Sequence, residues 1–376
     1  MKSLKIGIFT DSFYPSVGGT ETVVQKLASQ LAKTNEVTVF CPASKKADDQ
    51  NFNFKIVRAK ATALSENDLY ALPGLDSKFK KKLQDSDLDI IHCHTVSKMA
   101  GVGIKLAKKR NIPCVATIHT KFKTCYKSVS HSNLIANIMT KNLVRLINKA
   151  SLVTTVSHNM KEELEGYGYK KEIKIINNGI DIEKIINTQK NKQALTKPLL
   201  IYVGRIEKYK NLDFSLKALK ILKEQEMPFE FWLVGRGSKE KHYQKLINKL
   251  GLQDRCFLKG LMKQDELRKL FKQATLQLFP STFDSDGLSV SEAMAYGTPS
   301  LVLKNTGASE KIIDGENGFT AENDINAYAK RISEILSNEN LLNNIKNHKL
   351  KTWEEIANEY LNLYHNLLSN KLSTID

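Results

Sequence analysis

Residues 280–299 combine carboxylates and a glycine in a way that suits ligand chemistry. Asp284 and Glu292 stand on either side of Gly287. A glycine at the mouth of a helix lets backbone N–H groups approach an anion closely, and the helix dipole favours a negative ligand there. A carboxylate one turn inside that helix accepts hydrogen bonds from sugar hydroxyls. The pattern therefore suits a nucleotide sugar, which carries both phosphate and ribose. An ordinary loop and helix with solvated acids is the alternative.

Two cations mark the turn that follows an expected strand at residues 198–203. They are Arg205 and Lys210. Arg makes planar, paired hydrogen bonds to phosphate oxygens, whereas Lys supplies a point charge. A diphosphate leaving group is their natural partner, because fixed cations stabilise the charge that develops on it. Two exposed basic residues without a ligand are the alternative.

Glycines mark two further strand-to-helix turns. Gly18 and Gly19 open the helix after the first strand and let the chain pass close to a phosphate or an acceptor, although a plain tight turn explains them as well. Gly235 and Gly237 follow an apolar strand, but Glu240 occupies the third glycine position of a dinucleotide-binding fingerprint. The chain has no Walker Gly-x4-Gly-Lys-Ser/Thr motif, which excludes the P-loop nucleotide hydrolases.

Three histidines lie at the ends of expected strands in the first half. His92 and His94 alternate with apolar residues, so they share one face of a strand. Because no third ligand follows at a fitting spacing, we expect hydrogen-bonded histidines there rather than a metal site. His119 ends the apolar run 115–118. A lone histidine at a strand end is more often structural than catalytic, so its role stays open at this point.

Taken together, these motifs resemble those of the retaining GT-B glycosyltransferases of family 4 (glycosyl transferases group 1). That family has a Glu-x7-Glu motif at the place of residues 280–299, where Asp284 stands at the first position and Glu292 matches the second. The run 203–211 resembles the family pattern Val-Gly-Arg-Leu-x-x-x-Lys-Gly, with Asn211 at the final Gly. The resemblance covers most of the chain. Asp284 is one methylene shorter than the family's Glu, which affects the contact with the donor sugar.

The resemblance implies a role for each of these side chains. Arg205 and Lys210 would hold the diphosphate of a nucleotide sugar. Glu292 would bind the ribose hydroxyls, and Asp284 and His119 would orient the hexose. The further binding residues that the resemblance implies are Gly18, Gly19, Gly204, Gly235, Gly237, Gly287, Leu288, Ser289 and Glu310.

The resemblance also implies a reaction. The acceptor would replace the nucleotide on the same face of the sugar, and the leaving phosphate would take the acceptor proton. The pair of catalytic carboxylates that glycosidases use is then not required. We expect neither a cofactor nor a metal ion, because Arg205 and Lys210 would neutralise the diphosphate. UDP-hexose is favoured over GDP-mannose as the donor on frequency alone.

Composition agrees with an enzyme of a reducing cytoplasm. The chain has 376 residues, enough for two domains, and 41% of them are hydrophobic. No run approaches the roughly 18 apolar residues of a membrane span, and the N-terminus lacks the cleavage site of a secretory signal. Five scattered cysteines without Cys-x-x-Cys spacing argue against a disulfide or metal framework.

The net charge of +17 suggests an anionic partner. Basic residues cluster at 78–82 and at 105–110, and between Lys121 and Lys149 they alternate with apolar residues. A basic amphipathic surface of this kind docks on anionic lipid headgroups, which predicts a protein peripheral to the inner face of the cell membrane. A merely solvated basic face is the alternative. Nucleic acid is not expected as a partner, because no zinc-finger or RRM signature occurs.

Short apolar runs alternate with longer helical patterns along the chain, which predicts two α/β units with parallel sheets. The resemblance makes these a GT-B fold, with two Rossmann-like domains that face a cleft. We expect an acceptor-side domain at 1–182, a polar linker at 183–197 and a nucleotide-sugar domain at 198–353. A helix within 354–376 is implied to cross back to the first domain. The expected strands are 4–9, 36–41, 54–57, 88–93, 113–118, 151–156, 173–177, 198–203, 229–234, 255–258, 275–279 and 299–303. The expected helices are 19–33, 98–109, 132–148, 158–165, 211–225, 239–250, 263–272, 288–296, 308–313, 324–337 and 354–368.

We therefore expect a retaining, metal-independent hexosyltransferase that moves a hexose from a nucleotide sugar to an envelope glycan or a lipid-linked acceptor. A diacylglycerol-type glycolipid synthase is an alternative in the same class. A sugar-nucleotide epimerase is an alternative in another class, and it would convert the donor without a second substrate. A non-enzymatic nucleic-acid binder would show steep salt dependence and no donor binding.

Overall fold

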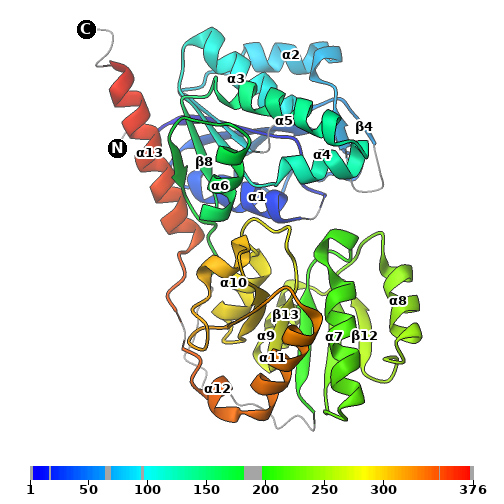
Figure 1. Ribbon diagram of the computed structural model, residues 1–376. Helices are drawn as coiled ribbons and strands as arrows, with labels where there is room; N and C mark the ends of the chain where they lie inside the picture. Colours follow the sequence, from blue (N-terminus) through cyan, green and yellow to red (C-terminus); the bar gives the residue numbers. More distant parts are fainter. Residues whose placement is uncertain are drawn as a thin grey trace. The chain divides into compact units, whose positions relative to one another are not determined.

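The computed structural model describes residues 3–16, 18–63, 69–94, 97–181, 197–346 and 348–372. The chain divides into two compact units, residues 1–179 with 351–376 and residues 180–350 (Figure 1). Each unit contains a parallel sheet with helices, which confirms the predicted fold class. The expected linker at 183–197 lies outside the described residues except for Lys197. No described helix combines the length and the apolar character needed to cross a membrane.

The first unit is built on a seven-stranded parallel sheet with the order β3-β2-β1-β6-β7-β8-β9. The order reverses between β1 and β6, which are neighbours in the sheet but far apart in the chain. Ligands of doubly wound folds bind beyond the carboxyl ends of the strands at such a switch point. The strands are β1 (Lys5–Thr10), β2 (Glu36–Pro42), β3 (Lys55–Ala59), β6 (Ile90–His94), β7 (Cys114–Ile118), β8 (Leu152–Thr155) and β9 (Ile173–Ile175), with a separate antiparallel pair β4 (Ala61–Ala63) and β5 (Leu69–Ala71).

Helices complete the first unit, and several begin at side chains that satisfy free backbone N–H groups. Ser157 Oγ accepts from Met160 N at 3.2 Å, as expected of an N-cap. Asp76 Oδ1 accepts from Phe79 N at 3.0 Å in the same way. The helices are α1 (Gly19–Leu31), α2 (Ser77–Gln84), α3 (Lys98–Arg110), α4 (Phe122–Ser130), α5 (Asn133–Ile147), α6 (His158–Gly166) and α13 (Trp353–Leu372), with a 3₁₀ turn η1 (Pro73–Leu75).

The last helix, α13, returns to the first unit and packs against α1 (Figure 1). Its Tyr360 and Tyr364 are buried. The start of α13 lies so close to Gly179 that an added Cβ there would be 2.7 Å from Trp353 Cα. Neither Asn178 nor Gly179 has a positive φ, so a left-handed backbone does not explain this turn. Close approach of the returning chain is what requires the glycine.

The second unit contains a six-stranded parallel sheet with the order β12-β11-β10-β13-β14-β15. Its switch point lies between β10 and β13, which pair through Leu200↔Leu276 and Ile201↔Gln277. The strands are β10 (Leu199–Val203), β11 (Glu230–Val234), β12 (Cys256–Gly260), β13 (Leu276–Phe279), β14 (Ser300–Leu303) and β15 (Phe319–Ala321). The helices are α7 (Leu212–Glu224), α8 (Glu240–Lys249), α9 (Gln264–Gln273), α10 (Leu288–Ala295), α11 (Ile325–Ser337) and α12 (Glu339–Asn343), with 3₁₀ turns η2 (Lys208–Lys210) and η3 (Gly307–Lys311).

The elements that the sequence missed are short or poor in apolar side chains. β4, β5 and β15 have three residues each, and α12 has five. In α2 the single buried apolar side chain is Phe79, so its helical periodicity is weak. α4 precedes a longer helix of similar composition, and only the second of the two was expected. The helix expected at 308–313 is the 3₁₀ turn η3.

Gly235 lets two turns of the second unit touch. Its φ is +138°, and an added Cβ would lie 1.9 Å from the backbone oxygen of Gly204. Gly204 N donates to Val234 O at 3.0 Å, and Ile206 N donates to Arg236 O at 3.0 Å. The turns after β10 and β11 therefore continue the hydrogen bonding of the two strands, with no room for a side chain between them.

We predict that Gly235→Ala lowers the free energy of unfolding of the second unit by about 3–5 kcal/mol, because both the φ angle and the backbone oxygen oppose a methyl group. Gly251→Ala is the matched control, since its φ is +67° but nothing lies within 4 Å of an added Cβ. Left-handed strain alone should cost about 1–2 kcal/mol there. Urea denaturation followed by Trp232 fluorescence measures both. Equal losses for the two variants would contradict the close contact.

Candidate functional site

The charged loops of the second unit begin at its switch point. The loop 204–211 follows β10, and the loop 280–287 follows β13, the neighbouring strand. Parallel strands end at one edge of the sheet, so these loops lie at the position where doubly wound folds bind ligands. The sequence singles out both loops, but it does not predict the contact between them.

An ion pair joins the two loops. Lys210 Nζ lies 2.5 Å from Asp284 Oδ1, and the side chains are 13% and 20% exposed. Asn211 adopts a left-handed φ of +59°, and its Nδ2 donates to Pro280 O at 3.2 Å. The rings of Tyr209 and Phe283 pack with centroids 5.1 Å apart. These contacts bring Lys210 and Asp284 together. The resemblance assigned the first to the diphosphate and the second to the hexose of the same ligand.

Asp284 also carries an oxygen that no described residue satisfies. Oδ1 accepts from Lys210, whereas Oδ2 is buried and has no hydrogen-bond partner among the described residues. A buried acceptor without a partner costs about 1–3 kcal/mol. A ligand hydroxyl that donates to Oδ2 would recover this energy.

The helix α10 begins at the end of the same loop. Gly287 is its N-cap with a φ of +73°, and an added Cβ would lie 2.9 Å from Ala308 Cβ. Leu288 and Ser289 are the first two residues, whose N–H groups have no acceptor within a helix. Glu292 lies one turn further on and is half-buried. The helix start thus offers backbone donors with a carboxylate close behind them.

A second ion pair supports this loop, and sequence reasoning missed it. Lys311 Nζ lies 2.8 Å from Asp286 Oδ1 and 2.7 Å from Ser291 Oγ. Asp286 is 4% exposed. Removing one partner of a buried pair is strongly destabilising, so this pair fixes the loop beside Gly287. The available signal was a third acidic residue between Asp284 and Glu292.

The other residues expected around the nucleotide lie in the turns that follow β10, β11 and β14. Arg205 is half-buried in the turn after β10, and Glu310 is exposed on η3. The turn after β11 has its own partners: Gly235 N donates to Gly260 O at 2.8 Å, and Gly237 N donates to Glu240 Oε1 at 2.9 Å. These two N–H groups are therefore already used. The pocket role expected of Gly204, Gly235, Gly237 and Glu310 stays a prediction.

In the first unit, three histidines form one buried cluster at the ends of β6 and β7. His94 Nδ1 lies 2.9 Å from His119 Nε2, and the rings of His92 and His94 have centroids 4.0 Å apart. His119 is 8% exposed. Gly18 and Gly19 lie elsewhere in this unit, at the start of α1, where Gly18 is extended with φ −178°. Among the described residues no group of three or more His, Cys, Asp or Glu is arranged to hold a metal ion.

The histidine cluster is tied to the last helix of the chain. His92 Nδ1 lies 2.6 Å from Tyr364 Oη, and its Nε2 lies 2.6 Å from Thr117 Oγ1. Tyr360 Oη lies 3.2 Å from the same threonine oxygen. The prediction of hydrogen-bonded histidines at this strand end is confirmed. The helix α13 thereby fixes the ring on which His94 packs, and His94 contacts His119.

Burial determines the charge of this cluster. It lowers the pKa of His92 to about 3, with a smaller contribution from His119. Burial also lowers the pKa of His94 well below its usual value. Both rings are therefore neutral at neutral pH, and each ring carries one N–H donor and one acceptor nitrogen.

A carboxylate at the switch point of the first unit was also missed from sequence. Asp11 follows β1 directly and accepts from Met99 N at 2.8 Å and from Ser97 N at 3.0 Å, at the start of α3. Burial raises the pKa of Asp11 to about 6, against the lowering effect of these hydrogen bonds. Its place after an apolar strand was the signal available in the sequence.

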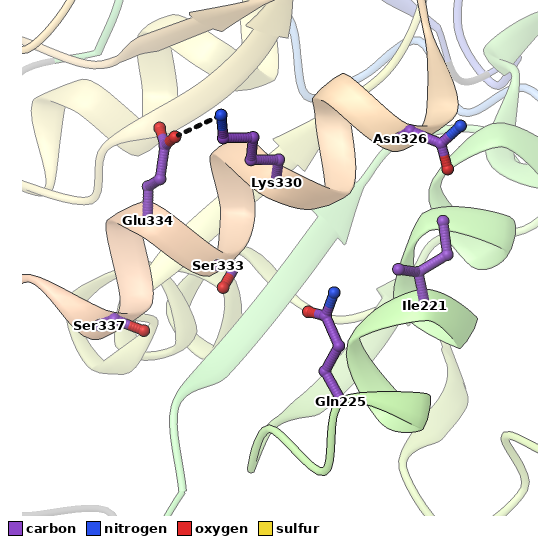
Figure 2. A pocket seen from close by; sticks show the side chains of 7 residues that line it. All are labelled: Ile221, Gln225, Asn326, Lys330, Ser333, Glu334 and Ser337. Atoms are coloured by element: carbon purple, nitrogen blue, oxygen red, sulfur yellow. Dashed lines mark ion pairs between the residues drawn. The ribbon is translucent and has the colours of Figure 1, made fainter.

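A hollow of about 480 Å³ lies away from all these residues, between α7 and α11 of the second unit (Figure 2). Its one ion pair joins Lys330 and Glu334 at 4.0 Å on the same helix. None of the expected site residues lines it. The lining consists of Ile221, Gln225, Asn326, Lys330, Ser333, Glu334 and Ser337.

Comparisons with known proteins identify related glycosyltransferases. Residues 17–184 match the family model "Glycosyltransferase Family 4", and residues 183–352 match "Glycosyl transferases group 1". The Alpha-monoglucosyldiacylglycerol synthase of Streptococcus pneumoniae is 26% identical over 80% of this chain and 71% of its own. The N-acetyl-alpha-D-glucosaminyl L-malate synthase of Bacillus anthracis is 29% identical over 97% of both chains. The structure of Anabaena HepE in complex with UDP is similar in fold, with a TM-score of 0.72 and 21% identity over 99% of both chains.

The neutral histidine predicts acid sensitivity of the first unit. The folded pKa of His92 is about 3, whereas an unfolded histidine titrates near 6.5. The unfolded chain therefore binds more protons between these values, so stability falls as the pH drops from about 6.5 towards 3. We predict that His92→Gln, which removes this titration, flattens the decline. Urea denaturation of both proteins at pH 7.5, 5.5 and 4.5 measures it, and parallel declines would refute the assignment.

Proposed function

We propose that this chain, which is a glycosyltransferase with the GT-B fold, transfers a hexose from a nucleotide sugar to a lipid-linked or envelope-glycan acceptor with retention of configuration. The observation that carries the proposal is the Lys210–Asp284 pair at the switch point of the second unit. It places a cation and an unsatisfied carboxylate oxygen beside the start of α10. A sugar diphosphate offers an anion to the first and hydroxyl groups to the second.

Each contact with the donor has a physical reason. Arg205 and Lys210 bind the diphosphate oxygens together with the N–H groups of Leu288 and Ser289. Glu292 accepts from the ribose hydroxyls. Asp284 uses Oδ1 to hold Lys210 and Oδ2 to accept from a hexose hydroxyl. The shorter Asp thus serves as both the anchor of the cation and the contact to the sugar.

The transfer step breaks the bond between the anomeric carbon and the β-phosphate oxygen. The acceptor oxygen forms its bond to the same face of that carbon, and its proton moves to the departing phosphate oxygen. Arg205 and Lys210 stabilise the charge that develops on this phosphate. No metal ion is required by this proposal, because the two cations perform that task. His119, on the first unit, orients the hexose.

The comparisons support a donor and an acceptor class. UDP, found in the HepE complex, supports a UDP-hexose. The names of the two relatives both specify alpha products, which retention yields from an alpha-configured nucleotide sugar. A diacylglycerol-type acceptor is the second candidate, and the synthase of Streptococcus pneumoniae favours it. We place the enzyme in the cytoplasm, at the inner face of the membrane where such acceptors lie.

The first prediction from this proposal concerns the leaving group. Arg205→Ala and Lys210→Ala should each lower kcat/KM about a hundredfold or more, as loss of a preorganised donor does. Wild-type activity should survive excess EDTA, because fixed cations and not a metal ion carry the charge. Release of nucleoside diphosphate in the presence of a membrane extract measures both. Loss of activity in EDTA that Mg²⁺ or Mn²⁺ restores would reject this account.

The second prediction separates the two carboxylates. Asp284→Asn should damage transfer more than binding of free UDP or GDP, since the hexose contact is lost. Glu292→Gln should weaken both, because the ribose contact is common to donor and product. Thermal shifts with a panel of nucleotide sugars identify the donor, and calorimetry beside transfer assays measures the variants. Normal transfer by the Asp284 variant would remove that carboxylate from the site. Conversion of donor without acceptor would favour an epimerase.

A further inference from the structure

The tip of the helical hairpin α4–α5 exposes apolar side chains. Five of the nine large hydrophobic residues that are exposed in the described part of the chain lie on it. They are Val129, Leu134, Ile135, Ile138 and Met139, with exposed fractions of 82%, 69%, 46%, 51% and 40%. Soluble surfaces rarely gather apolar side chains in this way unless the patch contacts a partner or a membrane.

These side chains are not the face that α5 turns towards the core. The buried stripe of α5 is Ala136, Thr140, Leu143, Val144 and Ile147. Leu134 and Ile138 stand one turn apart on the opposite side, as do Ile135 and Met139. Along the outer face of α5 the first two turns are therefore apolar, and Lys141 and Arg145 follow on the last two.

The chain segment that contains this apolar tip carries one sign of charge. Lys123 and Lys127 on α4 and Lys141 and Arg145 on α5 are exposed. Residues 90–161, which include α3, α4 and α5 entirely, contain twelve Lys or Arg and no Asp or Glu. Arg145 lies about 10 Å along the helix from Ile138. The basic side chains thus follow the apolar tip at a distance comparable to the thickness of a lipid headgroup layer.

We propose that the α4–α5 tip inserts into the surface of an anionic membrane, and that the basic residues behind it bind the lipid phosphates. The proposal rests on the proposed function, since it brings the enzyme to a lipid-linked acceptor. Apolar burial and attraction to anionic headgroups act together in such interfacial helices. A second copy of the chain fits less well, because neither α4 nor α5 contains Asp or Glu, so paired hairpins would bring like charges together.

Flotation with vesicles tests the apolar part. Wild-type protein should bind phosphatidylglycerol-containing vesicles, and Leu134→Ser with Ile138→Ser should lower the partition coefficient at least tenfold. Leu261→Ser with Ile313→Ser is the matched control, since these side chains are 59% and 51% exposed on the second unit. The control pair should bind as wild type does. Equal loss in both pairs, or no loss in the first, would overturn the proposal.

Charge reversal tests the basic part. Lys123→Glu with Lys127→Glu should weaken binding to anionic vesicles severalfold more than Lys245→Glu with Lys249→Glu on α8, although both pairs change the net charge equally. Binding should fade as salt rises and be weak on phosphatidylcholine. Equal binding to neutral and anionic vesicles would overturn the role of charge. Self-association without lipid that the apolar variants abolish would assign the tip to a second copy.

Insertion itself has a direct signature. The tryptophan introduced by Ile138→Trp should be quenched by brominated lipid chains, whereas that introduced by Ile313→Trp should not.

Calorimetry with UDP separates this proposal from the proposed function. Variants that lose vesicle binding but keep UDP affinity support the tip. A protein that binds vesicles without binding any nucleotide would retain the membrane surface and reject the transferase site, and absence of quenching would reject insertion.

Discussion

The ion pair between Lys210 and Asp284 organises the second unit's chemistry, because it closes the switch point of a parallel sheet. The strands β10 and β13 are neighbours in the sheet, so the loops that follow them bring Lys210 and Asp284 close together. Without the ion pair, both charges would be unpaired there. Pairing them in a partly buried position fixes the loop that leads into α10. The cost is an oxygen of Asp284 with no partner in the described protein. This combination fixes the loop and leaves one carboxylate oxygen available to a hydrogen-bond donor.

The first unit uses neutral polar groups for a similar purpose. His92 is held on both ring nitrogens, by Tyr364 from α13 and by Thr117 from β7. Because burial keeps the ring uncharged, these hydrogen bonds fix its orientation without the cost of burying an ion. His94 packs on that ring and contacts His119. The position of one candidate sugar-binding residue therefore depends on a helix from the far end of the sequence.

Much of this could be predicted from the sequence, and the limits have physical causes. The long strands were found because buried parallel strands are continuous apolar runs, as in Cys114–Ile118. Asp284 and Lys210 were found as separate candidates, because the residue type and the turn are local properties. Their contact joins residues 74 positions apart and depends on strand order, which local patterns do not contain. Asp286 and Asp11 were missed for the same reason, since each is defined by a distant partner.

The return of α13 to the first unit bears on how the protein is made. Tyr364 and His92 are separated by 272 positions, so a nascent chain displays the first sheet long before the helix that completes it has left the ribosome. Domains tend to fold in the order of synthesis. Residues 180–350 form a compact unit of their own and leave the ribosome before α13 does. The second unit can therefore fold while the first unit still lacks its final helix. The second unit is in effect an insertion in the first, and the twenty residues of α13 complete the first unit after the second has been made.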